Sequence, residues 1–532
     1  MTDATSEPPP DLVLCGGTVV DGGSGPPRVA DVAVRGDRIV HVGPDARRYA
    51  AAATEVVDVS GRLVLPGFVD AHSHADGRLG DPAVTEAYLR QGVTTVVVGQ
   101  DGVSFAPSCA ATAGELDRYF SAVNGPRPGA LSADASTAGL LAHFDTGIGV
   151  NAAALVPAGN IRAQIAGFAP HTPTADELRR MRALVARGLA DGAVGLSTGL
   201  EYVPGGFADA AELAELCRPV AEAGAVHVSH MRGYEEHAHT GIEELRRIAA
   251  RSGVATHVSH FHGPAAALRP LLDSALDAGL DFSFDSYPYT RGSTILSMLT
   301  LPPELQTGRS GGTLALLKDP ATRRELSRTW FPTLGDLPER VILAYTAAPS
   351  WRWAEGRRLT EVAATVDRPV GELICDLLVD CELGVGCLVQ QPAANTDDDV
   401  SELAQHRVHM AGSDGIFMGG APHPRAYGAF ARFLRDQVLE RANWSWADAV
   451  QHLSTRAVDR FGLGDRGLIA TGKIADLVVL DAGRVADLAT YDDSLQFADG
   501  VDHVVIGGAF ALRDGHLRNA TAGRAIRRGG SS

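Results

Sequence analysis

Short apolar runs alternate with turn-forming residues at both ends of the chain. Near the start, a Gly pair or a Gly-Asp step separates each run from the next, and the same style returns at 476–480, 503–506 and 509–512. Such spacing is typical of β-hairpins. We therefore expect residues 1–65 and 471–532 to form one small β-domain from the two ends of the chain.

Residues 66–470 alternate between apolar strand-like runs and amphipathic helical stretches such as 175–190 and 242–250. This alternation is typical of a parallel sheet with helices on its outside. Eight runs are predicted to be strands, namely 63–69, 94–98, 150–155, 194–196, 225–228, 255–258, 281–284 and 408–411. Eight is the number that closes a (β/α)8 TIM barrel, so we predict an α/β fold built on that barrel. Residues 298–340, rich in Gly and Pro, interrupt the alternation and are predicted to be an insertion rather than a separate domain.

Composition narrows the class of protein. The 532 residues are 45% hydrophobic and 21% charged, which allows a sizeable core and excludes general disorder. A formal net charge of −17 argues against a nucleic-acid or anionic membrane partner and favours a small molecule. No stretch approaches the roughly 20 apolar residues that span a bilayer, and the acidic, Pro-rich start has no signal pattern, so we expect a cytoplasmic protein. The six cysteines form no C-x-x-C pair and are expected to be buried thiols.

Five polar side chains stand out at the predicted strand ends. His72 and His74 follow an apolar run and a Pro-Gly step, and residues two apart on extended backbone face the same side, so both rings can reach one ion. His230, His260 and Asp414 lie at or just beyond three other strand ends. In a barrel these positions meet at the C-terminal face, where active sites lie. Each residue alone has a structural explanation, but together they indicate a site for Zn²⁺ or another divalent ion.

Further motifs follow in order along nearly the whole chain. They include Gly92–Gly99, 191–200 with Tyr202, His230-Met-Arg, Ser259-His260, Tyr287-Pro-Tyr-Thr, Ser413-Asp414-Gly and His423-Pro-Arg425. With them the chain resembles the amidohydrolase superfamily, and within it the N-acyl-D-amino-acid deacylases, or D-aminoacylases. The resemblance implies a β-sandwich beside a metal-bearing barrel. It also implies that His72, His74 and Asp414 surround one metal position, that His230 and His260 hold the other, and that Asp414 is general base and then general acid.

The chain departs from this family at one metal ligand. Relatives usually draw that ligand from the cysteine of a Gly-Asn-Cys-Gly segment after the second strand, and here the segment is Gly99-Gln-Asp101-Gly102. We therefore expect Asp101 to be a ligand, with Cys109 as a less favoured substitute. A carboxylate is harder than a thiolate and should loosen the preference for zinc. The expected cofactor is one or two Zn²⁺ ions, with another divalent metal as the alternative.

A second departure concerns the substrate. Relatives carry a lysine two residues after the histidine that matches His260, where it contacts the substrate carboxylate, and this chain has His262. Arg425 can still clamp a carboxylate through two hydrogen bonds, and Tyr287 with Ser293 can add more. Tyr202 is expected to help hold the amide or carboxylate end of the substrate.

The lysine inventory excludes one kind of metal site. Hydantoinases, dihydroorotases, ureases and phosphotriesterases of this superfamily bridge their metals with a carboxylated lysine at a strand end. The chain has only Lys318, in the predicted insertion, and Lys473, in the returning β-domain. Neither can supply that bridge.

The leading hypothesis is a hydrolase of non-peptide carbon-nitrogen bonds that cleaves the amide of N-acyl-D-amino acids or closely related N-acyl compounds with metal-activated water. Asp414 would pass the proton of that water to the leaving nitrogen. A second hypothesis keeps the chemistry but changes the substrate to a cyclic amide, a D-peptide or a specialised N-acyl metabolite. A third is a catalytically silent barrel that only binds.

Overall fold

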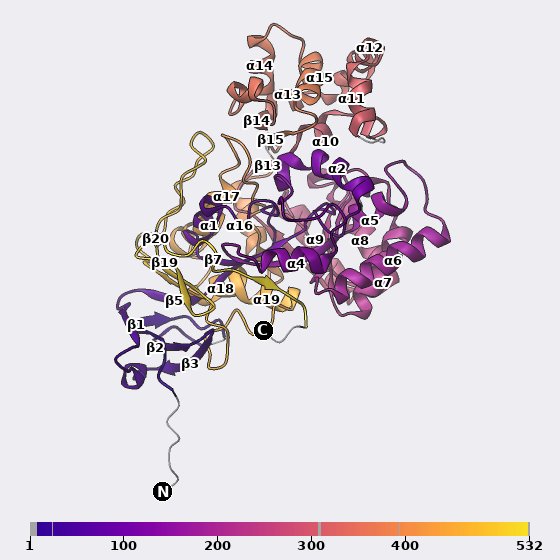
Figure 1. Ribbon diagram of the computed structural model, residues 1–532. Helices are drawn as coiled ribbons and strands as arrows, with labels where there is room; N and C mark the ends of the chain where they lie inside the picture. The colour runs from indigo at the N-terminus through magenta and orange to yellow at the C-terminus, as the bar shows by residue number, and fades with distance from the viewer. Residues whose placement is uncertain (1–7, 24, 307–309, 393, 530–532) are drawn as a thin grey trace.

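The computed structural model describes residues 8–23, 25–306, 310–392 and 394–529. Residues 1–7, the first part of the acidic, Pro-rich start, lie outside the described part. Figure 1 shows a β-sheet domain, a central barrel covered by helices, and a mostly helical lobe on the far side of the barrel from the β-sheet domain. None of the described helices is long and apolar enough to cross a membrane.

Eight parallel strands form the barrel. In sheet order they are β6 (Phe68–Asp70), β7 (Val93–Val98), β8 (Asn151–Pro157), β9 (Gly195–Gly199), β10 (Val226–His230), β11 (Ala255–Val258), β12 (Phe282–Ser286) and β16 (His409–Ala411). The ring closes just beyond β6 and β16, where the Ala71 amide donates to the Ala411 carbonyl at 3.1 Å and the Asp414 amide donates to the His72 carbonyl at 2.8 Å. These contacts confirm the predicted (β/α)8 barrel.

The predicted strand 63–69 is two strands, which corrects the sequence analysis. β5 (Leu63–Pro66) belongs to the terminal sheet, and β6 starts the barrel. Gly67 joins them at a point where an added Cβ would lie 2.1 Å from Thr94 Oγ1, so a larger residue cannot fit without displacing the neighbouring strand. A single residue therefore links the two sheets.

Both ends of the chain build one sheet, as predicted. The N-terminal side supplies β1 (Leu12–Val19), β2 (Arg28–Arg35), β3 (Arg38–Gly43), β4 (Glu55–Asp58) and β5, and the C-terminal side supplies β17 (Leu477–Leu480), β18 (Val501–Ile506), β19 (Ala509–Arg513) and β20 (His516–Leu517). β5 lies between β1 and β17, where the two halves meet. A short strand, β21 (Ala525–Ile526), instead pairs with β8 of the barrel.

Helices surround the barrel. They are α1 (Pro82–Leu89), α4 (Thr137–Phe144), α5 (Ala158–Ile165), α6 (Ala175–Ala190), α7 (Ala210–Glu222), α8 (Ala238–Ser252), α9 (Ala265–Asp277), α16 (Asp397–Ala404), α17 (Arg425–Phe433), α18 (Trp446–Val450) and α19 (Arg456–Phe461). The predicted helix 175–190 coincides with α6, which begins with a capping box between Thr174 and Glu177, and 242–250 lies within α8.

The lobe lies between β12 and β16 in the chain. Its antiparallel sheet consists of β13 (Arg291–Ile295), β14 (Val341–Thr346) and β15 (Val385–Gln390), and its helices include α10 (Leu296–Thr300), α11 (Ser310–Lys318), α12 (Pro320–Thr329), α13 (Leu337–Arg340), α14 (Leu359–Thr365) and α15 (Val370–Asp380). The segment 298–340 forms part of this lobe. The domain limits 66–470 and 471–532 stay predictions.

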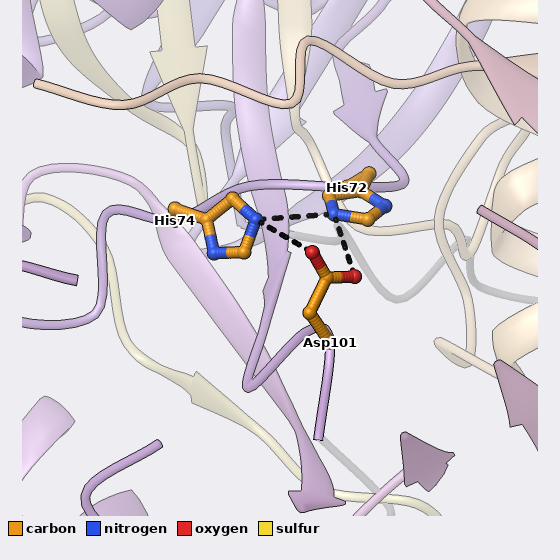
Figure 2. Close-up of side chains that lie close together, drawn as sticks. All are labelled: His72, His74 and Asp101. Carbon is orange, nitrogen blue, oxygen red and sulfur yellow. Dashed lines mark hydrogen bonds and ion pairs between the residues drawn. The ribbon is translucent and has the colours of Figure 1, made fainter. Parts of the chain in front are cut away.

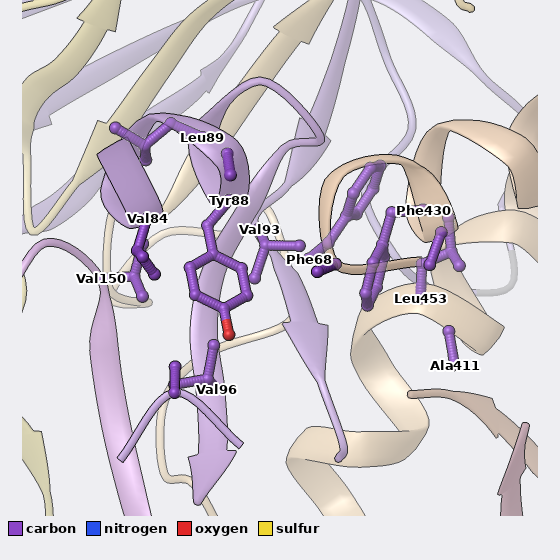
Figure 3. Packing of buried hydrophobic residues seen from close by; sticks show 14 of the residues in the cluster. Phe68, Val84, Tyr88, Leu89, Val93, Val96, Val150, Ala411, Phe430 and Leu453 are labelled. Carbon is purple, nitrogen blue, oxygen red and sulfur yellow. The ribbon is translucent and has the colours of Figure 1, made fainter. Parts of the chain in front are cut away.

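A buried apolar cluster fixes the start of the barrel. Phe68 of β6 stacks on Phe430 of α17 with ring centroids 6.1 Å apart, and Figure 3 shows both rings beside Tyr88, Val93 and other cluster members. Both phenylalanines are fully buried. This packing holds β6 against α17, so it also positions the residues that follow β6.

We expect Phe430→Ala to lower the free energy of unfolding by about 3–5 kcal/mol, because the lost ring leaves a cavity that the cluster cannot fill. The midpoint of urea unfolding, followed by circular dichroism, measures the change. Leu439→Ala is the matched control, since Leu439 is 43% exposed and its loss should cost about 0.5 kcal/mol or less. Equal midpoint shifts for the two variants would contradict the role of the stacked pair.

Candidate metal centre

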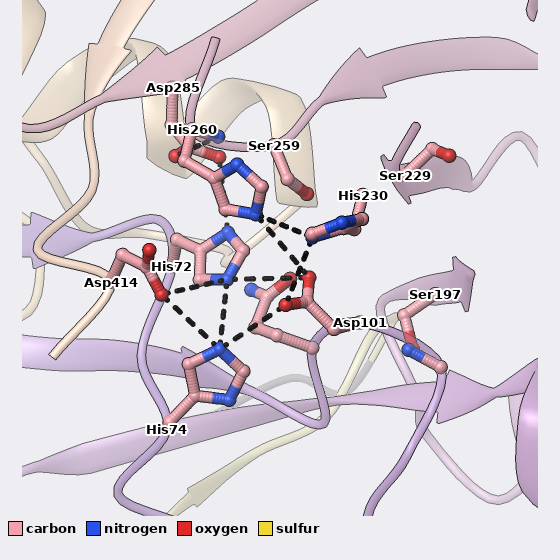
Figure 4. Close-up of polar contacts among 12 residues, drawn as sticks. His72, His74, Asp101, Ser197, Ser229, His230, Ser259, His260, Asp285 and Asp414 are labelled. Carbon is pink, nitrogen blue, oxygen red and sulfur yellow. Dashed lines mark hydrogen bonds and ion pairs between the residues drawn. The ribbon is translucent and has the colours of Figure 1, made fainter. Parts of the chain in front are cut away.

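Six side chains at the C-terminal ends of barrel strands meet at one buried place (Figure 4). They are the six predicted metal ligands His72 and His74 after β6, Asp101 after β7, His230 at the end of β10, His260 after β11, and Asp414 after β16. Each is at most 6% exposed. The barrel thus brings together residues that are as far as 342 positions apart in the chain.

The Asp101 carboxylate lies between two pairs of imidazoles. Figure 2 shows the carboxylate facing His72 and His74. Its Oδ1 is 3.6 Å from His72 Nε2 and its Oδ2 is 3.5 Å from His74 Nε2. On the other side, Oδ2 is 3.5 Å from His230 Nδ1 and Oδ1 is 3.8 Å from His260 Nε2. In each half, the three possible ligand atoms lie within 4.8 Å of one another. One carboxylate shared by two triads is the arrangement needed to bridge two ions.

Two buried atoms of this group, His72 Nδ1 and Asp101 Oδ1, lack a hydrogen-bond partner among the described residues. Asp101 Oδ1 is buried and has no hydrogen bond from the described residues. An unsatisfied buried carboxylate oxygen costs free energy, which a cation beside it would recover. Imidazole nitrogens and carboxylate oxygens are ligands of Zn²⁺ and similar ions, so the donor set fits a divalent metal.

Three of the six residues have unusual backbones. The φ angles are 54° at Asp101, 34° at His260 and 48° at Asp414, in the left-handed region that side chains other than Gly rarely adopt. Such conformations cost free energy and cluster at functional sites, where the surrounding fold holds them in place. The barrel therefore orients these side chains at the expense of local strain.

Outer oxygens orient the histidine rings. His72 Nδ1 lies 3.4 Å from Asp285 Oδ2, and the same aspartate accepts the His260 amide at 2.8 Å. His74 Nδ1 donates to Asn124 Oδ1 at 3.1 Å. Nε2 of each ring therefore faces the cluster, where the two atoms lie 3.3 Å apart.

His230 is oriented in the same way. Its Nε2 lies 3.0 Å from Glu201 Oε2, so its Nδ1 faces Asp101. Sequence reasoning missed Glu201, Asp285 and Asn124. A carboxylate at the end of the apolar run of β12 could have indicated Asp285, whereas Asn124 comes from α3 (Ser121–Asn124), where nothing in the pattern marks it.

The charges are strongly coupled. Burial alone would lower the pKa of His74, but Asp101 and Asp414 outweigh it and raise that pKa to about 10. Burial opposes the charged form of His230 as well, yet Asp101 and Glu201 raise its pKa to about 10. In return, the imidazoles hold the pKa of Asp101 well below its usual range although burial would raise it.

Asp414 is held by a fully buried arginine. Arg425 Nη2 lies 2.7 Å from Asp414 Oδ2, and Arg425 Nε donates to the Asp414 carbonyl at 2.7 Å. Burial raises the pKa of Asp414, but Arg425 and the neighbouring histidines lower it far below its usual value. Asp414 Oδ1 instead faces His74 Nε2 at 3.3 Å.

A cavity of 270 Å³ opens beside the six residues. The predicted substrate residues Tyr202, His262, Tyr287 and Ser293 line it, together with apolar side chains that include Met298, Leu299 and Val389 from the lobe. Arg425 does not line the cavity, but its guanidinium lies 4.3 Å from the centre of the Tyr287 ring. The structure therefore places four predicted substrate residues at the cavity and the fifth directly next to it.

Comparison with known proteins agrees with this geometry. The model of the amidohydrolase family matches residues 55–511. The chain belongs to the amidohydrolase family. This amidohydrolase is 33% identical to an N-acyl-D-glutamate deacylase of Alcaligenes xylosoxydans xylosoxydans over 94% of this chain and 93% of that protein. It is 32% identical to a D-aminoacylase of the same organism over 99% of both chains.

Two solved structures extend the comparison. A crystal structure of D-aminoacylase matches 98% of this amidohydrolase with a TM-score of 0.80 and 31% identity, and 100% of that chain is covered. N-acyl-D-glutamate deacylase from Bordetella bronchiseptica, complexed with zinc and a phosphonate mimic of the tetrahedral intermediate, matches 98% of this chain and 100% of that one, with a TM-score of 0.81 and 29% identity. The resemblance to the D-aminoacylases is confirmed.

The other residues considered as metal ligands, Cys109, Lys318 and Lys473, lie outside the cluster. Cys109 precedes α2 (Ala110–Tyr119), where its Sγ is 3.2 Å from Thr112 Oγ1, and it belongs to neither triad of the described residues. Lys318 ends α11 of the lobe, and Lys473 pairs with Asp465 at 3.2 Å. All six cysteines are free thiols, and five are buried as expected, whereas Cys109 is only half-buried.

We expect Zn²⁺ to bind more tightly as the pH rises from 6 to 8. An ion must displace protons from His74 and His230, whose pKa values are about 10, so each displaced proton should lower the apparent dissociation constant by up to about tenfold per pH unit. Competition with a chromophoric chelator measures the constant. An affinity that does not change with pH would contradict the protonated state of these rings.

Asp101→Asn should weaken Zn²⁺ binding at least tenfold at every pH, because the amide nitrogen cannot replace an oxygen that faces both triads. Asp492→Asn, in an exposed loop, is the control and should bind like the wild type.

Proposed function

We propose that this amidohydrolase is a metal-dependent hydrolase that cleaves the amide bond of N-acyl-D-amino acids or closely related N-acyl compounds. The observation that carries the proposal is the buried cluster of four histidines and two aspartates, with Asp101 shared by both halves, beside a 270 Å³ cavity. The relatives support it, because three of them are an N-acyl-D-glutamate deacylase, a D-aminoacylase and an N-acyl-D-aspartate deacylase.

In this proposal the metal ligands are His72, His74, Asp101, His230, His260 and Asp414. Zinc is the favoured ion, one or two per chain, because one related structure holds zinc and another is described as having a binuclear metal centre. When bound, such an ion would polarise the substrate carbonyl and lower the pKa of water. Asp101 lacks the thiolate softness of a cysteine ligand, so other divalent ions stay alternatives.

Asp414 would carry the proton. Its Oδ2 is occupied by Arg425, whereas its Oδ1 faces His74, and the residue lines the cavity. Asp414 would accept a proton from the attacking water at Oδ1 and pass it to the leaving nitrogen, which would otherwise be a very poor leaving group. The pairing with Arg425 keeps the carboxylate ionised and ready to accept that proton.

The remaining residues would position the substrate. Tyr287 and Ser293 would donate hydrogen bonds to a carboxylate, and Arg425, whose guanidinium lies 4.3 Å from the centre of the Tyr287 ring, would support this side through that ring. Tyr202 would support this side through its 2.9 Å hydrogen bond with Thr294. His262 would contact the amine half of the substrate.

A small-molecule substrate and a cytoplasmic location are part of the same proposal, and the net charge of −17 supports the first. The convergence of all six metal-binding groups argues against a silent barrel.

Turnover of N-acetyl-D-methionine, N-acetyl-L-methionine and a cyclic amide by the zinc-loaded protein tests the proposal. Stereospecific release of D-methionine is expected, and turnover of the cyclic amide alone would overturn it.

Asp414→Asn should lower kcat by about 10²-fold or more, because an amide cannot accept the proton that the leaving nitrogen needs. Release of free amine, followed with a fluorogenic reagent, gives the rate, and zinc content is measured on the same sample. Asp492→Asn is the exposed control and should keep wild-type kcat. Undiminished turnover by a zinc-loaded Asp414→Asn protein would exclude Asp414 as the proton carrier.

A further inference from the structure

One part of the cavity wall carries two glutamates. Glu201 follows β9 and Glu235 follows β10, and both line the cavity with side chains that are 34% and 23% exposed. No lysine or arginine occurs among the described residues that line it. The cavity itself is a ligand site on separate grounds, because its lining includes Asp101, which is shared by both triads and has a buried, unpartnered oxygen.

Hydrogen bonds hold the Glu201 carboxylate, and the Glu235 carboxylate lies beside His262. Glu201 Oε1 accepts the Gly233 amide at 3.1 Å while Oε2 orients His230. Glu235 Oε1 lies 3.8 Å from His262 Nε2, and an added Cβ on Gly263 would lie 3.1 Å from the Glu235 Cα, so the two loops are closely packed.

Nearby guanidinium groups are occupied elsewhere. Arg340 also acts on Glu235 electrostatically, but it pairs with Asp336 at 3.2 Å and donates to the Gln390 carbonyl at 2.9 Å. Arg425 is paired with Asp414. Among the described residues, the acidic wall therefore has no lysine or arginine partner inside the cavity.

His262 is held against the acidic wall. Its Nδ1 lies 2.7 Å from the His260 carbonyl, which can only accept, so this nitrogen donates. Its ring stacks on Tyr234 with centroids 4.9 Å apart and planes 2° from parallel, which holds it flat against the wall. A substrate carboxylate beside His262 would approach Glu235 and be repelled, whereas a cation there would be attracted.

We propose that the enzyme selects substrates whose amine half carries a second, positively charged group, which Glu235 binds with support from Glu201. Within the proposed function, on which this inference rests, such substrates are N-acyl derivatives of basic D-amino acids. Their carboxylate would face Tyr287 and Ser293, and their side-chain cation would face Glu235. The two ends of the substrate would thus be recognised by opposite charges on different parts of the cavity wall.

A matched pair of substrates isolates the charge. Nα-acetyl-D-lysine and N-acetyl-D-norleucine have the same four-carbon side chain and differ in the terminal ammonium. We expect kcat/KM of the zinc-loaded wild type to be at least tenfold higher for the lysine compound, and N-acetyl-D-glutamate to be the poorest of the three. The lysine preference should shrink when salt is raised from 0.05 to 0.5 M, because ions screen a partly exposed charge pair.

Glu235→Gln tests the residue, since Glu235, unlike Glu201, does not hold a histidine of the metal cluster. In this variant, the ratio of kcat/KM for Nα-acetyl-D-lysine to kcat/KM for N-acetyl-D-norleucine should fall towards one. Glu236→Gln is the matched control, because Glu236 is the next residue and its side chain is 85% exposed, and it should keep the wild-type ratio.

The outcomes separate this inference from the proposed function. Turnover of N-acetyl-D-norleucine without a preference for Nα-acetyl-D-lysine would overturn the inference and leave the proposed function standing. A lysine preference that survives Glu235→Gln unchanged would overturn the assignment to Glu235. If the zinc-loaded protein hydrolyses none of the N-acetyl-D-amino acids, both the inference and the proposed function are overturned.

Discussion

The site depends on one shared carboxylate. Asp101 is the group within reach of both imidazole pairs, and its single negative charge faces four ring nitrogens at 3.5 to 3.8 Å. No other described residue belongs to both triads. Because a carboxylate has two oxygens in fixed geometry, the positions of the histidines on either side are tied to each other through it. A small displacement of the loop after β7 would change both halves together.

The rest of the barrel serves to hold that arrangement. Three kinds of restraint limit the conformations of these side chains. Three of the six residues have left-handed backbone, outer oxygens lie against the rings of His72, His74 and His230, and Asp414 pairs with Arg425. The result is a buried cluster in which each charge is stabilised by its neighbours of opposite charge. Asp101 raises the pKa of His74, and the imidazoles in turn lower the pKa of Asp101 and keep it ionised.

Much of this could be read from the sequence because barrels convert order in the chain into position in space. Each of the eight predicted strands has a counterpart, and the polar residues at strand ends meet where the barrel predicts. The boundary between β5 and β6 was missed although Pro66 and Gly67 interrupt the apolar run there, because such a step does not reveal by itself that the chain passes from one sheet to another. Glu201 and Asn124 were missed for a related reason, since they lie in loops and helices whose contacts arise only when distant segments pack.

The interlocked terminal sheet has a consequence for how the protein is made. β5 needs β17 as its neighbour on one side, and β17 follows roughly 400 residues later in the chain. At about 5–20 residues per second, the ribosome takes roughly 20–80 s to deliver that partner. Throughout this interval the nascent chain exposes an open edge of β5, which is a template for wrong pairing. Chaperone protection during translation would therefore matter most for the first strands to emerge.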